Sequence, residues 1–262
     1  MVQLDQAGSG MDRITIVPAR GPAAAAIEFF WLHRAPQSGR PQRWRIVPDG
    51  SAHLLYHSPR PALGASGRLC IVGARSTFTD ADLSWRSFSL GARLRPGALR
   101  ALTRIPAPEL CDVAVPFRSL EPDSAAMLAD RLRAAGDPVQ ALRTFCDAVG
   151  ERVRAYRPDP FDVRATHVLG RRAANVREAS AALDASPRWL RERFRRSTGL
   201  SPKRFMRVNR LFRALGLAVQ ANDPAWARIA ALCGYFDQSH LIHEFGELLG
   251  ETPERFLARR EH

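Results

Sequence analysis

The chain is poor in cysteine and lysine and has no long hydrophobic run, and these shortages exclude several classes of protein. Its four cysteines are far apart and include no Cys-x-x-Cys pair, a pattern that argues against a disulfide scaffold or a structural zinc site. The apolar stretch 23–32 is interrupted by Glu28 and is too short to span a bilayer. Residues 1–12 lack the basic start and apolar core of a secretory signal. We therefore expect free thiols in a cytoplasmic protein that has no membrane partner.

Recognisable catalytic motifs are also missing. The sequence has no Gly-rich phosphate loop, nucleophile elbow or paired carboxylates. His53 and His57 are four residues apart, so on a strand they would face the same way and could form a metal site with Glu28, Asp49 or Cys70. The close His-x-His plus carboxylate spacing of metal-binding barrels is absent. We expect ordinary histidines, no metal and no cofactor, with a metal-dependent enzyme as the alternative.

Positive charge is abundant but unevenly distributed. The 262 residues include 39 Lys and Arg against 26 Asp and Glu, a net charge of +13 that favours a polyanionic partner. All but one of these basic residues are arginine, so genome composition contributes to the excess and the location of the charge is more informative. Residues 188–213 hold ten basic residues and one acidic residue, whereas residues 222–262 hold four and seven. We expect the nucleic-acid footprint on 188–213.

The first half of the chain predicts strands and the second half predicts helices. Pro and Gly punctuate six short β-prone runs, a spacing typical of a β-sandwich or barrel: 14–17, 29–33, 44–47, 53–56, 69–72 and 85–94. Two amphipathic helices follow, the first capped by Ser124, and they would pack on the β domain or, less simply, on a second copy of the chain. The expected order is a flexible tail at 1–12, a β-rich sensing or dimerisation domain at 13–122, a helical connector at 123–157 and an all-α domain at 158–262. The fold class is therefore α+β.

The C-terminal domain contains two copies of one helical plan. Each copy reads as a short helix, a tight turn, a second helix with Leu and Phe four residues apart, a Gly and a Ser/Thr-Pro helix start. The buried pairs are Leu190 with Phe194 and Leu241 with Phe245. Two helix pairs joined by short turns predict paired helix-turn-helix DNA readers. A non-specific architectural DNA binder would also explain the charge, but not two ordered readers with different outward faces.

The long helix between the copies acts as a spacer. It begins at Ser201-Pro202 and runs to about Ala221, and some eighteen residues at ~1.5 Å each give about 27 Å. Such a spacer would set two reading helices roughly 34 Å apart, which is one turn of DNA. Basic residues on the first reader and on this helix would bind phosphates: Arg195, Arg196, Lys203, Arg204, Arg207 and Arg210.

Residues 165–260 resemble the DNA-binding domain of AraC/XylS-type transcription regulators. The matching stretches are Trp189–Phe194, Thr198–Pro202, Ile229–Leu241, Glu244-Phe245 and Gly250–Pro253. The resemblance implies about seven helices with two helix-turn-helix units, each placing one helix in a major groove. By position, Arg188, Arg191 and Glu192 match the base-facing sites of the first reader. Gln238, Ser239, His240 and His243 match those of the second.

Four departures from that family pattern matter. A basic residue is usual where His243 stands and frequent where Gly246 stands, and Ala and Gly are commoner than Ser180 and Asp184 in the first turn. Because the segment after residue 222 is also net acidic, we expect the first reader to dominate affinity. Arg191→Ala should then cost roughly 1–3 kcal/mol at the operator, and His243→Ala should cost less.

The N-terminal half resembles the cupin-like domain of a subset of these regulators. The matching phrases are Phe30-Trp31, Val47–Gly50, Val72-Gly73 and Leu90–Gly97. The resemblance implies an effector-sensing or dimerising domain, with the effector site unknown. The partners it implies are double-stranded operator DNA, RNA polymerase, a small-molecule effector and a second copy of the chain. A cupin-type metal-dependent enzyme or small-molecule-binding protein with an appended DNA-binding domain is the alternative.

Overall fold

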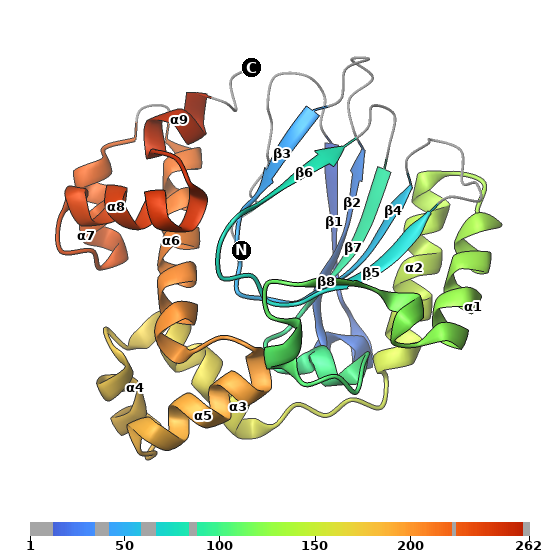
Figure 1. Cartoon of the computed structure of the whole chain (residues 1–262), viewed down its shortest axis with the longest axis horizontal. Coiled ribbons are helices and arrows are strands. Elements are labelled where there is room, and N and C mark those ends of the chain that lie inside the picture. Colours follow the sequence, from blue (N-terminus) through green and yellow to red (C-terminus); the bar gives the residue numbers. More distant parts are fainter. Residues whose placement is uncertain (1–12, 35–41, 59–66, 84–87, 222–223, 259–262) are drawn as a thin grey trace.

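Two antiparallel sheets form the N-terminal half (Figure 1). The computed structural model describes residues 13–34, 42–58, 67–83, 88–221 and 224–258, so the expected tail at 1–12 lies outside it. Six strands pair in the order β1-β2-β7-β4-β5-β8, and β3 pairs with β6. Their bounds are β1 Arg13–Pro18, β2 Ile27–Arg34, β3 Gln42–Ile46, β4 His53–Ser58, β5 Arg68–Val72, β6 Thr79–Leu83, β7 Phe88–Leu94 and β8 Ala114–Pro116.

One face of the six-stranded sheet is covered by helices α1 (Pro122–Arg133) and α2 (Pro138–Val153). Burial alternates along β4, with Leu54 and Tyr56 in this core. Phe30 of β2 meets Phe145 of α2 edge-on, with ring centroids 6.3 Å apart. The expected packing of this helix pair on the β domain is therefore confirmed.

The prediction that Ser124 caps the first connector helix is wrong. Glu121 occupies the N-cap position and Pro122 the first helical position, so Ser124 lies inside α1. Proline suits this position because its φ angle is already helical and it has no N–H to leave unsatisfied. The hydroxyl of Ser124 instead accepts a hydrogen bond from Arg152 at 3.0 Å.

Strands β6 and β8 were not predicted from the sequence. β6 contains Asp80 and Asp82, and aspartate is depleted in strands. Pairing with β3 stabilises it, because Arg45 donates from Nε to Asp80 Oδ1 at 2.8 Å. β8 has three residues, too few for a periodic pattern.

The C-terminal half contains seven described α-helices, as the resemblance implied. Their bounds are α3 Pro160–His167, α4 Val176–Ala182, α5 Pro187–Thr198, α6 Pro202–Gln220, α7 Trp226–Cys233, α8 Gln238–Leu249 and α9 Pro253–Ala258. α6 contributes to two separate hydrophobic cores, one with α3 to α5 and one with α7 to α9. In the part of the chain that the structure describes, no helix is long and apolar enough to cross a membrane.

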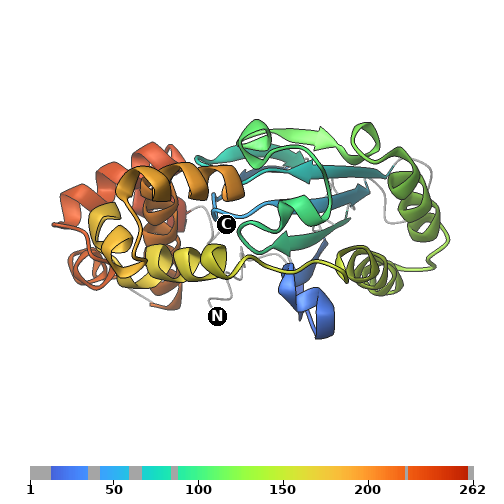
Figure 2. The ribbon, with the colours of Figure 1, turned by 90° about the horizontal axis from the view of Figure 1, so that it is seen from below.

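The two halves touch at both helix-turn-helix units (Figure 2). At the second unit, the Phe78 N–H donates to the Leu248 carbonyl at 2.9 Å, and Arg45 donates to the Leu249 carbonyl at 2.9 Å. At the first unit, the loop carrying Ala107 packs against Gly199, where a Cβ would lie 2.8 Å from the Ala107 oxygen. The β domain therefore contacts and supports both helix-turn-helix units.

Candidate nucleic-acid interface

The first helix-turn-helix unit is formed by α4 and α5. Ser186 caps α5 by accepting a hydrogen bond from the Trp189 N–H at 3.2 Å, and Pro187 occupies the first helical position. Leu190 and Phe194 are fully buried. The predicted cap, helix start and buried pair are all confirmed.

The turn of this unit accommodates both residues that depart from the family pattern. Asp184 adopts φ +51°, the left-handed conformation in which glycine is usual and aspartate is among the tolerated residues. Ser180 is buried, and its hydroxyl donates to the Arg177 carbonyl at 2.8 Å. The turn geometry is therefore kept without the glycine.

The outward face of α5 is strongly basic. Arg188, Arg191, Glu192, Arg195 and Arg196 are all exposed there. Glu192 lies 3.2 Å from Arg196 and 3.9 Å from Arg195, so it is shared by two arginines of the same helix. Arg188 and Arg191 form no ion pair with any described residue. Their guanidinium groups are therefore available to an external acceptor.

The opposite side of α5 is anchored to α3. Arg193 pairs with Asp159 at 2.6 Å and with Asp162 at 3.2 Å, and the Ser197 hydroxyl donates to Asp162 at 2.6 Å. These contacts fix the rotation of α5 about its axis. The free arginines consequently face away from the domain.

The second unit is formed by α7 and α8. Gly234 has φ +77° in the turn, as predicted, and Asp237 caps α8 by accepting the His240 N–H at 2.7 Å. Leu241 and Phe245 are fully buried. The local design of the second copy therefore matches that of the first.

The outward face of α8 carries no arginine or lysine. Gln238 and Ser239 are exposed. His240 folds back on the turn, where its Nδ1 accepts the Phe236 N–H at 3.3 Å. His243 is 75% exposed but lies 3.6 Å from the Glu247 carboxylate. This reader offers polar and aromatic contacts with little positive charge.

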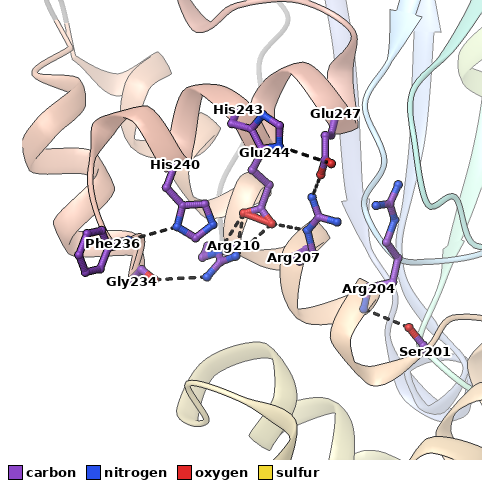
Figure 3. A network of polar contacts seen from close by, with 10 residues as sticks. All are labelled: Ser201, Arg204, Arg207, Arg210, Gly234, Phe236, His240, His243, Glu244 and Glu247. Atoms are coloured by element: carbon purple, nitrogen blue, oxygen red, sulfur yellow. Dashed lines mark hydrogen bonds and ion pairs between the residues drawn. The ribbon is translucent and has the colours of Figure 1, made fainter.

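Glu244 lies at the centre of an ion-pair cluster between α8 and α6 (Figure 3). Its side chain is 1% exposed and accepts from Arg207 Nε at 2.6 Å and from Arg210 Nη2 at 2.8 Å. Arg207 also binds Glu247, and this contact lowers the pKa of that carboxyl. We call Arg207, Arg210, Glu244 and Glu247 the α6–α8 cluster.

The α6–α8 cluster changes the role of two predicted phosphate contacts. Arg207 and Arg210 were expected to bind DNA, but both direct their guanidinium groups at Glu244. Arg210 also donates to the Gly234 carbonyl at 3.3 Å and lies 4.5 Å above the Tyr235 ring. A buried carboxylate requires such paired cations. These arginines therefore hold α8 and its turn on α6.

The sequence contained a signal for this cluster that the charge count missed. Glu244 stands among the buried Leu241, Phe245 and Leu248, so a helical projection places a carboxylate on an apolar face. Such a group needs a cation from a neighbouring helix. Arg207 and Arg210 are spaced three apart on α6 and supply two.

Lys203 and Arg204 differ in their surroundings. Lys203 is exposed at the start of α6 and makes no ion pair with a described residue. Arg204 is half-buried, and Figure 3 shows its side chain beside Arg207 with no hydrogen bond or ion pair drawn to the α6–α8 cluster. Burial, and then the neighbouring charge of Arg207, lowers the pKa of Arg204. Of the two recognition helices, only α5 therefore carries exposed arginines, and Lys203 adds an exposed cation at the start of α6.

The residues considered for a metal site are engaged in other contacts. Arg93 donates to Asp49 Oδ2 at 2.6 Å and also binds Glu28, while His53 donates to the same Asp49 oxygen at 3.0 Å. Burial alone would raise the pKa of Asp49, but the charges of Arg93 and His53 outweigh it and lower that pKa. His57 is hydrogen-bonded to Ser89 at 2.9 Å. Within the described ranges, no cluster of three or more His, Cys, Asp or Glu is arranged to hold a metal.

The cysteines are free thiols. Burial raises the pKa of all four, which keeps them protonated at neutral pH and unreactive. The four are Cys70, Cys111, Cys146 and Cys233.

Comparison with known proteins matches both halves of the chain. Residues 179–259 match the family model described as a helix-turn-helix domain, and residues 16–116 match a domain of unknown function, DUF6597. Curated protein sequences give no significant match.

Solved structures of ToxT from Vibrio cholerae match this chain at low sequence identity. One is 10% identical with a TM-score of 0.44, covering 87% of this chain and 96% of ToxT. A complex with (E)-4-(8-methylnaphthalen-1-yl)but-3-enoic acid is 11% identical with a TM-score of 0.43, covering 95% and 98%. A complex with an unsaturated fatty acid is 11% identical with a TM-score of 0.39, covering 94% of each chain. A likeness of this degree transfers neither a ligand nor an activity.

Proposed function

Because the C-terminal domain of this chain is an AraC-type helix-turn-helix domain, we propose that the protein is a sequence-specific transcription regulator that inserts α5 and α8 into adjacent major grooves of DNA. The observation that carries this proposal is that both readers are fixed to one straight spacer. The 19 residues of α6 span about 28 Å, close to the ~34 Å repeat of the groove.

The two readers would contribute differently to binding. In the first, Arg188, Arg191 and Glu192 would face bases, while Arg195, Arg196 and Lys203 would bind phosphates. In the second, the base-facing positions are those of Gln238, Ser239, His240 and His243. We infer that the first reader supplies most of the affinity and the second adds specificity.

Selection of bound sequences from random DNA by the full-length chain tests this function. We expect an enriched site with two elements about 10 base pairs apart. Binding should survive an excess of unlabelled random DNA, whereas a double variant with Arg188→Ala and Arg191→Ala should lose the preference for the first element. Competition that removes all binding would instead indicate a non-specific architectural protein.

A cavity beneath α1 and α2 is our candidate effector site. Its volume is about 190 Å³, and it is lined by the buried apolar side chains of Leu54, Phe117 and Val149 and, on the two helices, by Arg131, Glu151 and Arg152. A cavity of roughly 150 Å³ lined by Leu, Ile and Phe stays dry and binds benzene. We infer that this one takes a small, largely apolar ring compound. RNA polymerase and a second copy of the chain are further partners that such a regulator would use.

The cavity is connected to the spacer helix through β4. Leu54 borders the cavity, and its neighbour His53 binds Asp49 on the other face of the sheet. Gly50 follows Asp49 and lies against Phe205 of α6, where a Cβ would approach the ring to 3.2 Å. Filling the cavity would therefore alter the support of the helix that carries both readers.

Thermal unfolding with a small ring compound such as indole tests the cavity. At about ten times its dissociation constant, the compound should raise the Tm of the native chain by about 3 °C. Ala148→Leu fills part of the cavity from α2 and should abolish this rise. An equal rise in both proteins would place the compound elsewhere.

A further inference from the structure

The second reader lacks the charge that usually attracts a recognition helix to DNA. α8 carries no arginine or lysine, and Asp237 and Glu247 place negative charge at both ends of its outward face. Arg207 and Arg210, the nearest cations on α6, are committed to Glu244. α8 itself therefore adds little attraction to phosphate, and a different kind of contact has to supply its binding.

Phe236 is the anomalous side chain of this reader. It is 92% exposed, the largest value among the exposed large hydrophobic residues of the described chain. It stands in the turn between α7 and α8, directly before the cap residue Asp237. A phenyl ring is stabilised when another surface covers it, so this exposed ring beside the recognition helix is available to a partner.

The outward orientation of Phe236 is built into the turn. Tyr235 takes the inward position and is buried against the core of α6 to α9. The Phe236 N–H donates to His240 Nδ1 at 3.3 Å, and Asp237 caps the next turn through the His240 N–H at 2.7 Å. Figure 3 shows the ring at the start of α8, away from the α6–α8 cluster. Turning it inward would break these contacts.

The position of Phe236 indicates which kind of partner its ring would contact. In a helix-turn-helix protein the first residues of the recognition helix contact base edges, so the residue just before the cap lies beside them. Gln238 and Ser239 are those first residues here. In the major groove, the apolar group that distinguishes one base from the others is the C5-methyl of thymine.

We propose that Phe236 packs against the C5-methyl group of a thymine at the edge of the α8 half-site. The second reader then takes its specificity from an apolar contact, which compensates for its missing arginines. This inference rests on the proposed function, because it requires α8 to enter a major groove.

A double-mutant cycle between protein and DNA tests the contact. The full-length chain and Phe236→Ala are titrated with the selected site and with a site whose second half carries deoxyuridine for thymine, which deletes only the methyl group. For the native chain, loss of one buried methyl should weaken binding by about fourfold. Phe236→Ala should bind the thymine site at least that much more weakly and show no further loss with deoxyuridine. Phe236→Leu should keep part of the discrimination.

The controls separate this inference from the proposed function. Deoxyuridine in the first half-site should affect the native chain and Phe236→Ala equally. Because the ring is exposed, the Phe236→Ala variant should unfold at the same temperature as the native chain. Equal losses with deoxyuridine in the second half-site for both proteins would overturn the contact, as would native binding by Phe236→Ala. A result in which the variant binds DNA normally but fails in transcription would indicate a protein partner and would also overturn it. Failure of every protein to prefer any sequence would instead reject the proposed function.

Discussion

At the scale of single residues, the two readers differ in which charges are free. Arg188 and Arg191 on α5 form no ion pair within the described chain, whereas His243 on α8 lies beside Glu247. An arginine that reaches a guanine edge does so with two parallel hydrogen bonds and a permanent charge. A histidine beside a carboxylate offers neither. The charge distribution predicted that the first reader dominates affinity, and these contacts give a geometric reason for that prediction.

Substitution of Arg191 and His243 tests the expected difference in affinity between the two readers. Arg191→Ala should weaken operator binding by roughly 1–3 kcal/mol, because it removes an unpaired cation from the first reader. His243→Ala should cost less, since the imidazole beside Glu247 has no permanent charge to lose. Titration of each full-length variant with the same operator compares them. A larger loss for His243→Ala would refute the dominance of the first reader.

At the scale of elements, α8 depends on α6 for its orientation. Glu244 is enclosed between two helices and accepts from two arginines of α6, one of which also holds the turn before α8. A buried carboxylate that is paired in this way fixes a specific geometry more than it adds stability. Its removal, however, leaves Arg210 without a carboxylate partner among the described residues and Arg207 with Glu247 alone.

Two variants of α8 distinguish the role of Glu244 in orienting α8 from the simple loss of one negative charge. Glu244→Gln should lower the free energy of unfolding by about 3 kcal/mol, because the buried cluster loses its shared carboxylate. Glu247→Gln makes the same change of net charge at a side chain that is 45% exposed, and its cost should stay within about 1 kcal/mol. Urea unfolding measures both. Equal costs would show that the burial of Glu244 between α6 and α8 is not the source of the effect.

At the scale of the whole molecule, the β domain supports the spacer helix. The Asp49–Arg93 pair lies beneath α6, since the Arg93 guanidinium is 5.9 Å from the Phe212 ring and Gly50 lies against Phe205. Contacts of Phe78 and Arg45 reach the end of α8. The two readers are therefore positioned by residues from both halves of the chain.

The pH dependence of stability reports on the Asp49–Arg93 pair. The pKa of Asp49 is lower in the folded chain than its unfolded value of about 3.9. The pair thus stabilises the fold above that value and loses its effect as the pH falls through the folded pKa. Arg93→Met should cost about 3–5 kcal/mol at neutral pH, because it removes the arginine partner of the largely buried Asp49 carboxylate.

The cost of Arg93→Met should shrink between pH 5 and pH 3. Protonation of Asp49 in the variant removes the unpaired charge. The free energies of unfolding of the native chain and of Arg93→Met should therefore become more similar at acidic pH. Urea unfolding at several pH values measures it. A cost that is constant or grows with acid would contradict the electrostatic role of the pair.

The sequence by itself determined the local plan of both readers. Caps at Ser186 and Asp237, the left-handed Gly234 and the buried Leu and Phe pairs depend on neighbours within about four residues, so their spacing along the chain is sufficient to predict them. The Pro and Gly breaks of the N-terminal half likewise predicted most of its strands, whereas the number of C-terminal helices came from the family resemblance.

Only the tertiary structure decided which charges are free. Glu244 meets Arg207 and Arg210 across 37 and 34 residues, and Arg93 meets Asp49 across 44. β6 likewise exists because β3 pairs with it. Such partners are chosen by the packing of whole elements, and an arginine that binds DNA has the same side chain as one that binds a buried carboxylate.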